Sequence, residues 1–225
     1  MGAAALLLLA DGRFPAGAHA HSGGAEAAVR AGRITGPVSL AAFCRGRLHT
    51  SGLVAAALAA AACGGAADPG ALDAAADART PSPALRATAR RLGRQLMRAT
   101  RATWPSPELD ALAGAHPGGL HQPVVLGLAA RAAGLAPRDA AAAAAYEAVS
   151  GPATATVRLL SLDPFDATAV LARLTGDLDR VADLATAAGA AVAARGTDAL
   201  PAASAPLLDI AAEAHAGWPV RLFAS

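Results

Sequence analysis

The chain has 225 residues, of which 54% are apolar and 16% are charged, and its formal net charge is +2. This composition excludes the disordered class, which combines low hydrophobicity with high net charge. Alanine accounts for 69 residues. Because alanine favours helices and disfavours strands, we expect closely packed helices rather than a β-sandwich or barrel. The prediction is an all-α fold in a single domain over residues 1–225, with about eight helices and no sheet.

The sequence predicts no membrane span and no export signal. The apolar stretch at 2–10 has no basic residues before it and stops at Asp11, so we expect a buried helix there. The apolar run at 53–63 is shorter than the roughly 20 residues that a bilayer requires. Cys44 and Cys63 are expected to be reduced and buried in a cytoplasmic protein, because a chain with a large core needs no disulfide.

Glycine and proline divide the chain into helical segments. Pro37 and the pair Asp163-Pro164 are typical of helix starts, and Gly64 and Gly134 are typical of helix ends. Loops are expected at 66–83 and 104–119. In chain order, the expected helices are 2–10, 22–30, 37–63, 84–103, 120–133, 137–145, 152–162, 164–185 and 207–215.

The helix expected at 84–103 has a basic face and an apolar face. At about 100° per residue, five arginines fall in one sector and the apolar residues lie opposite. The five are Arg86, Arg90, Arg94, Arg98 and Arg101. Residues 78–107 contain no Asp or Glu, so this basic face is expected to attract phosphate or an acidic partner, or to remain simply solvated.

Few residues in the sequence could carry out chemistry. His19 and His21 are weak candidates for a metal site, because two imidazoles do not complete a ligand set and His49 and Cys44 would have to lie nearby. Alternatively, these imidazoles are hydrogen-bonded at a packing junction. Ser22 beside His21 lacks a nucleophile elbow, and the chain has no phosphate-binding glycine loop. We therefore expect no enzyme, no catalytic residues and no resident metal.

A helical nucleic-acid-binding regulator, using the basic face from Arg86 to Arg101, is the alternative from another functional class. The small net charge of +2 and the aromatic content of 3% favour a protein partner instead. We therefore predict that the chain binds neither nucleic acid nor a membrane.

Several short motifs, taken in their order along the chain, resemble those of one protein family. The N-terminal turn matches the family pattern at Pro15, Gly17, Ser22, Gly24 and Glu26. Arg86, Arg90 and Gly93 match an arginine-rich helix. Arg158 stands where the family has a basic residue before leucine, and the chain ends in Arg-Leu-Phe-Ala-Ser at 221–225. Over nearly its whole length the chain resembles the UreF family of urease accessory proteins.

This resemblance implies an all-helical, homodimeric protein that bridges UreD, also called UreH, and the GTPase UreG. Such an assembly inserts nickel into apo-urease, so the resemblance implies that this chain binds no cofactor and that its partners handle nickel and GTP. By the same resemblance, Glu26 and Arg158 correspond to positions in the contact with UreG. Arg221 corresponds to a position needed for assembly of the complex.

The C-terminal tail at about 216–225 is predicted to bind a partner. Trp218, Leu222 and Phe223 are too apolar to be left in water without something to cover them. The alternative is that the tail folds back onto its own domain.

Overall fold

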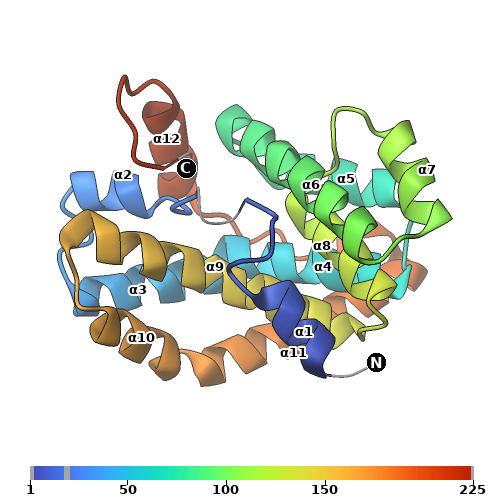
Figure 1. Cartoon of the computed structure of the whole chain (residues 1–225), viewed down its shortest axis with the longest axis horizontal. Helices are drawn as coiled ribbons and strands as arrows, with labels where there is room; N and C mark the ends of the chain where they lie inside the picture. The colour runs from blue at the N-terminus through green and yellow to red at the C-terminus, as the bar shows by residue number, and fades with distance from the viewer. Residues whose placement is uncertain (1–2, 18–20, 224–225) are drawn as a thin grey trace.

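The computed structural model describes residues 3–17 and 21–223, and within these residues it is helical with no strand (Figure 1). The predicted all-α class is confirmed, but the helices are more numerous than the eight or so expected. In chain order they are α1 (Ala3–Ala10), α2 (Ala25–Arg30), α3 (Pro37–Arg47), α4 (Leu53–Gly64), α5 (Pro69–Ala78), α6 (Pro83–Thr103), α7 (Pro107–Ala115), α8 (Gln122–Ala132), α9 (Pro137–Leu160), α10 (Pro164–Arg173), α11 (Thr175–Arg195) and α12 (Pro206–Ala216).

Helix α4 passes through the middle of the molecule and packs against α8, α9 and α11 (Figure 1). Its side chains are mostly alanines, and nearly all of them are buried. Two glycines allow the neighbouring backbones to approach α4. A Cβ atom on Gly127 of α8 would overlap the carbonyl oxygen of Ala59, and one on Gly189 of α11 would lie 2.9 Å from the backbone nitrogen of Ala61. The close helix packing predicted from the alanine content is confirmed.

The two segments expected to be loops, 66–83 and 104–119, each contain a helix. Helix α5 begins after Asp68, whose carboxylate accepts hydrogen bonds from the backbone N–H groups of the first turn. Helix α7 begins at Pro107. Proline is tolerated in the first helical turn because its missing N–H has no partner there in any case. Pro69 and Pro107 therefore begin helices α5 and α7 in segments that were expected to be loops.

Several helix boundaries differ from the prediction. Helix α9 continues through Gly151 and Pro152, where a new helix was expected, and Pro152 is buried with its ring 3.2 Å from a Cβ built on Gly23. Packing against the N-terminal turn thus offsets the lost helical hydrogen bond. The helix expected at 164–185 is instead divided at Leu174, and its second part, α11, continues to Arg195 where a linker was expected. Thr175 and Gly176 follow this break, and both residue types have low helix propensity.

The long helix expected at 37–63 is confirmed as a continuous rod of α3, a π-helical segment Leu48–Gly52, and α4. Both cysteines are buried and unpaired by disulfide, as predicted. Helix α1 is not the buried helix that was expected, since Leu7 and Leu8 are exposed and only Leu9 is buried. Among the helices of the described ranges, none is long and apolar enough to span a membrane.

Candidate partner-binding site at the C-terminal tail

The side chain of Glu26 joins α2, α12 and the C-terminal tail. Its Oε2 atom lies 2.9 Å from Nε2 of His215 and accepts a hydrogen bond of 3.1 Å from the backbone N–H of Phe223. Its Oε1 atom accepts one of 2.8 Å from the backbone N–H of Leu222. Because the residue is only 7% exposed, these contacts lie largely out of water. We call this group of contacts the tail anchor, and through it the tail folds back onto α2.

The N-terminal motif residues build the start of α2 and thereby orient Glu26. Gly24 precedes the helix with φ of 90°, a left-handed conformation that costs glycine little and other residues more. The buried hydroxyl of Ser22 accepts a hydrogen bond of 3.3 Å from the backbone N–H of Glu26. This part of the motif therefore has a structural use within the chain. Pro15 and Gly17 lie in the preceding turn, where Gly17 has φ of 81°.

The tail anchor favours the charged form of Glu26. Burial raises the pKa of this carboxyl group, but hydrogen bonds from Leu222, His215 and Phe223, together with charge attraction to His215, lower it by more. The net result is a pKa below the ordinary value. The carboxylate is therefore ionised at neutral pH, when it holds the tail.

Other side chains fix the tail on either side of the anchor. The indole of Trp218 packs against the ring of His215, with centroids 4.6 Å apart, and lies under the guanidinium of Arg30 at 4.1 Å. Phe223 is buried, and the guanidinium of Arg158 lies 5.1 Å from its ring centroid. Cation–π contacts of this kind add to the apolar burial. In this structure Arg158 therefore contacts the tail of its own chain.

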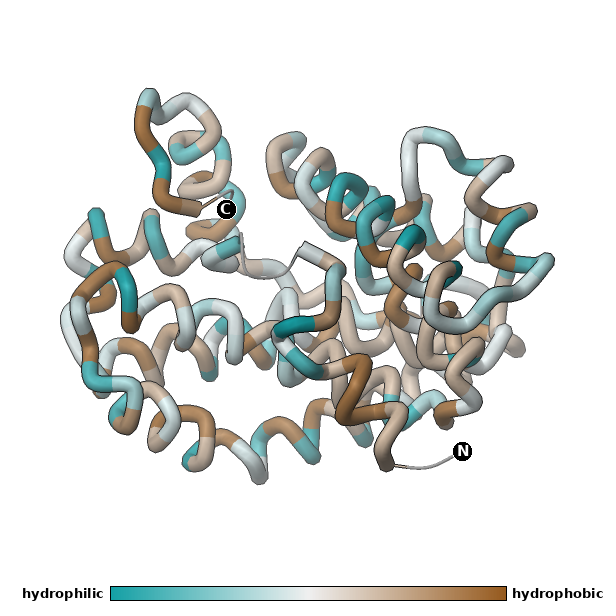
Figure 2. Tube along the Cα trace, viewed as in Figure 1, coloured by the Kyte–Doolittle hydropathy of each residue, from teal (hydrophilic) through white to brown (hydrophobic). Residues whose placement is uncertain are grey.

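Beside these buried residues the tail leaves a partly apolar surface open to water. The exposed fraction is 77% for Val220 and 64% for Leu222, and Arg221 is also exposed. On α12, Leu207 and Ile210 are 63% and 66% exposed. We call these five residues the tail surface. In Figure 2 parts of α12 and of the tail are coloured as hydrophobic.

Helix α12 is held against the start of α6 by polar contacts. The backbone N–H of Ser82 donates a hydrogen bond of 3.2 Å to the carboxylate of Asp209, and the hydroxyl of Ser82 donates one to the carboxylate of Glu213. The same carboxylate accepts a hydrogen bond of 2.9 Å from the backbone N–H of Ala84. Helix α12, which carries Leu207 and Ile210 of the tail surface, is therefore fixed at two places, by Ser82 just before α6 and by Glu26 of α2.

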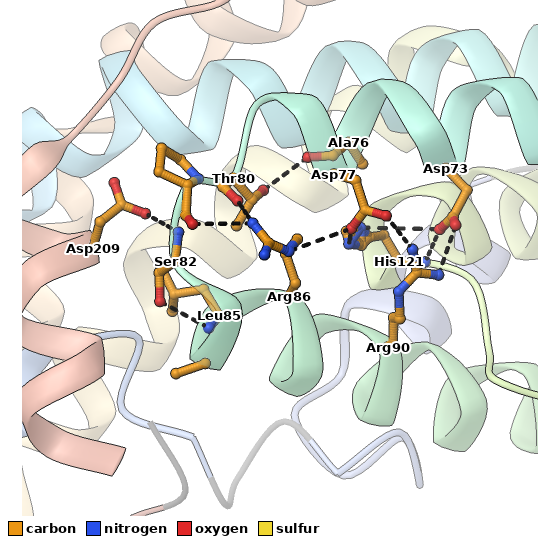
Figure 3. A network of polar contacts seen from close by, with 12 residues as sticks. Asp73, Ala76, Asp77, Thr80, Ser82, Leu85, Arg86, Arg90, His121 and Asp209 are labelled. Atoms are coloured by element: carbon orange, nitrogen blue, oxygen red, sulfur yellow. Dashed lines mark hydrogen bonds and ion pairs between the residues drawn. The ribbon is translucent and has the colours of Figure 1, made fainter. Parts of the chain in front are cut away.

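Much of the basic face of α6 is neutralised within the chain (Figure 3). The guanidinium of Arg90 donates hydrogen bonds of 2.6 Å to Asp73 and of 2.6 Å to Asp77, both on α5. The guanidinium of Arg86 lies 3.8 Å from the carboxylate of Asp77. Both acids lie in the segment 66–83 that was expected to be a loop. Their spacing of four residues would place them on one face of a helix, and this was the signal available in the sequence.

His121, just before α8, completes this network, although no sequence motif pointed to it. It is 1% exposed, and its Nε2 lies 3.1 Å from Asp77. Its backbone N–H donates a hydrogen bond of 2.7 Å to the carboxylate of Asp73. Burial lowers the pKa of His121, and nearby Arg90 acts in the same direction against the two carboxylates. The network therefore contains a neutral imidazole at neutral pH and ties α5, α6 and α8 together.

The remaining arginines of the basic face differ in their contacts. Arg94 donates to the carbonyl oxygen of Gly118, and Arg101 forms an ion pair with Asp110 on α7. Arg98 is exposed and makes no hydrogen bond or ion pair with any residue that the structure describes. The basic face is thus interrupted by acids from α5 and α7, which counts against a continuous groove-reading surface for nucleic acid.

We expect the replacement of Arg90 by alanine to lower the free energy of unfolding by about 2 kcal/mol, because Asp73 and Asp77 lose their charged partner in a partly buried place. Urea denaturation followed by circular dichroism measures this change. Arg98→Ala is the matched control on the same helix, and its effect should stay within about 0.5 kcal/mol. Equal effects of the two substitutions would show that the network does not stabilise the fold.

The candidate metal ligands are not assembled into a site by the described residues. His19 lies outside those residues. His49 is 3.6 Å from Asp177, and Cys44 is buried with its Sγ directed at the carbonyl oxygen of Val149. Within the ranges that the structure describes, no three His, Cys, Asp or Glu side chains form a group that could hold a metal ion.

Comparison with known proteins assigns the family. The sequence model of the UreF family matches residues 34–175. A protein of Mycobacterium marinum named urease accessory protein UreF is 46% identical over 222 residues, which cover 99% of this chain and 98% of that protein. The protein of the same name from Mycolicibacterium vanbaalenii is 45% identical over 225 residues, covering 99% and 98%. That of Mycobacterium tuberculosis strain H37Rv is 41% identical over 212 residues, covering 94% and 93%.

The first two matches cover 99% of this chain, so they include both the N-terminal turn and most of the tail. An accessory protein is not itself a catalyst, in agreement with the prediction that this chain is no enzyme. From the matching family model and these relatives, the chain belongs to the UreF family.

Proposed function

We propose that this chain is a scaffold for nickel insertion into apo-urease. It binds UreD (UreH) through the tail surface and recruits the GTPase UreG to the same assembly, while nickel and GTP are bound by its partners. The family and the names of its relatives support a urease accessory role. We also propose that it acts as a homodimer in the cytoplasm, as the resemblance implies.

The observation that carries this proposal is the convergence of three separate motif segments. Glu26 of α2 binds Leu222 and Phe223 of the terminal motif in the tail anchor, and beside it Arg158, near the end of α9, lies over the ring of Phe223. Four apolar side chains of α12 and the tail, Leu207, Ile210, Val220 and Leu222, are exposed in the same C-terminal segment. Exposed apolar groups gathered at one place are typical of a surface that a partner covers. The residues that the resemblance assigns to partner binding thus lie close to the surface that we propose a partner covers.

Reconstitution from purified components tests the proposal. The chain, UreD, UreG and apo-urease are combined with nickel and GTP, and urease activity is measured with and without the chain. We expect the chain to co-elute with UreD, the pair to retain UreG in the presence of GTP, and urease to be activated only when all are present. Full activation without the chain would contradict the proposal.

Within this proposal, Arg221→Ala should weaken the binding of UreD about tenfold, because an exposed cation beside Val220 and Leu222 is lost from the interface. The melting temperature should change little, since the side chain is exposed and makes no hydrogen bond or ion pair within residues 3–17 and 21–223. Isothermal titration calorimetry and differential scanning calorimetry measure the two quantities. Arg195→Ala, an exposed arginine at the end of α11, is the matched control. A large fall in melting temperature for Arg221→Ala would show a structural role instead.

A further inference from the structure

A cavity of about 230 Å³ lies between the C-terminal half of α6 and α7, next to the start of α8. Its apolar lining includes Met97, Leu120 and Val125. Its polar lining is entirely basic or neutral, and the charged or titratable members are Arg94, Arg98, Arg101 and His116. The cavity thus has an apolar floor and a rim of cationic groups.

The positive charge of this rim is only partly used within the chain. Arg98 makes no hydrogen bond or ion pair among the described residues, and Arg94 is bonded only to the carbonyl oxygen of Gly118. Arg101 pairs with Asp110, but both side chains are exposed, at 42% and 60%, and such pairs contribute little. No acidic side chain is among the residues that line the cavity. The rim therefore keeps a net attraction for carboxylates.

The size of the cavity favours a single side chain over a small-molecule ligand. Pockets for drug-sized ligands usually enclose roughly 300–1,000 Å³. We infer that this cavity binds an acidic segment of a partner protein, with one leucine- or phenylalanine-sized side chain on the apolar floor and flanking carboxylates against Arg94 and Arg98. The inference adds a second contact to the proposed scaffold, and it rests on the proposed function for the assembly in which that partner occurs.

A second copy of this chain is the competing occupant. Phe165 is 84% exposed and is flanked by Asp163 and Asp166, so it has the required chemistry. However, α10 lies at the opposite end of the molecule from α7 (Figure 1). Docking of one copy's α10 on another copy's α7 joins two different surfaces, and such contacts tend to give open polymers unless the rotation closes. A different protein is therefore the better match.

The test uses fluorescent pentapeptides as probes and the full chain at low salt. The sequence Asp-Glu-Phe-Glu-Asp is compared by fluorescence anisotropy with Asn-Gln-Phe-Gln-Asn, which lacks the charges, and with Asp-Glu-Ala-Glu-Asp, which lacks the ring. We expect the first peptide to bind at least about tenfold more tightly than either of the others. It alone has both an aromatic ring for the apolar floor and carboxylates for the cationic rim. Equal binding of all three, or no binding at about 1 mM, overturns the inference.

Substitutions locate the binding to the cavity. Arg98→Glu and Ala113→Trp should each weaken binding of the acidic phenylalanine peptide about tenfold, the first by reversing a rim charge and the second by filling the space. Arg91→Glu is the matched control, since Arg91 is exposed on the same helix but does not line the cavity. Circular dichroism checks that each variant is folded. If Arg91→Glu weakens binding as much as Arg98→Glu, only general charge attraction is present and the inference fails.

Two further readouts separate this inference from the proposed function. Activation of urease by the reconstituted system, together with no binding of peptide, refutes the cavity inference but leaves the scaffold role. Binding of peptide that depends on Arg98, together with no activation of urease, refutes the scaffold role but leaves the cavity inference. Sedimentation of the chain alone addresses the second copy: polymers that disappear in Phe165→Ala would assign the cavity to self-association and overturn the inference.

Discussion

Replacing Glu26 with alanine is expected to release the C-terminal tail from the body of the protein. The substitution leaves His215 and the backbone N–H groups of Leu222 and Phe223 without their shared carboxylate in a place closed to water. Removal of one partner from a buried charged contact costs about 3 kcal/mol or more. Native-state hydrogen exchange of the Leu222 and Phe223 amides should therefore become about 100-fold faster, and binding of UreD should weaken in parallel.

Acidity provides a second measurement of the same contact. The pKa of Glu26 is lowered from its ordinary value of 4.5. A lowered pKa means that the carboxylate stabilises the folded tail above the ordinary value and that this contribution is lost as the pH falls through the lowered one. In the wild type, the protection of the Leu222 and Phe223 amides from exchange should be lost as the pH falls through the lowered pKa. In Glu26→Ala, the protection of these amides should not show this dependence on acid. Unchanged exchange in the variant would show that the carboxylate does not hold the tail.

Substitution of Gly127 by valine is expected to lower the free energy of unfolding by about 3 kcal/mol, the upper part of the range for overpacked cores. A Cβ atom at this position overlaps the carbonyl oxygen of Ala59 and lies 2.7 Å from the Cβ of Ala62. Because the first of these atoms belongs to the backbone of α4, relief requires that α4 and α8 move apart. Urea denaturation at constant pH measures the change.

The matched control is Gly114→Ala on α7, where an added Cβ meets nothing within 4 Å. Alanine has the higher helix propensity, so this control should stabilise the protein slightly, by about 0.5 kcal/mol. If Gly127→Val unfolds at the same urea concentration as the wild type, α4 and α8 do not pack through their backbones as the structure indicates.

The fold class could be predicted from the sequence because alanine content acts locally on helix formation and on how closely helices approach. The number of helices could not, because glycine and proline have different effects at the first turn and in the middle of a helix. Pro69 and Pro107 start helices, whereas Pro152 continues one where its ring is covered by tertiary packing. That packing is not visible in the local pattern.

The candidate site was predictable as separate motifs but not as one place. Glu26 and Phe223 are far apart in the chain, and helical periodicity carries no information about which ends meet. The basic face shows the same limit, since Arg90 is neutralised by Asp73 and Asp77 from another helix. Charges counted along one helix therefore overstate the free charge of its surface.

Removal of residues 217–225 deletes the whole tail beyond α12, including the anchored Leu222 and Phe223, and so tests whether UreD binds through the tail. Equilibrium binding of purified UreD is measured for the full chain and for the truncated chain, after calorimetry has shown that both are folded. We expect the full chain to bind UreD and to recruit UreG with GTP, while the truncated chain binds UreD at least about 100-fold more weakly. Equal binding of UreD by the two chains, with equal activation of urease, would contradict this expectation.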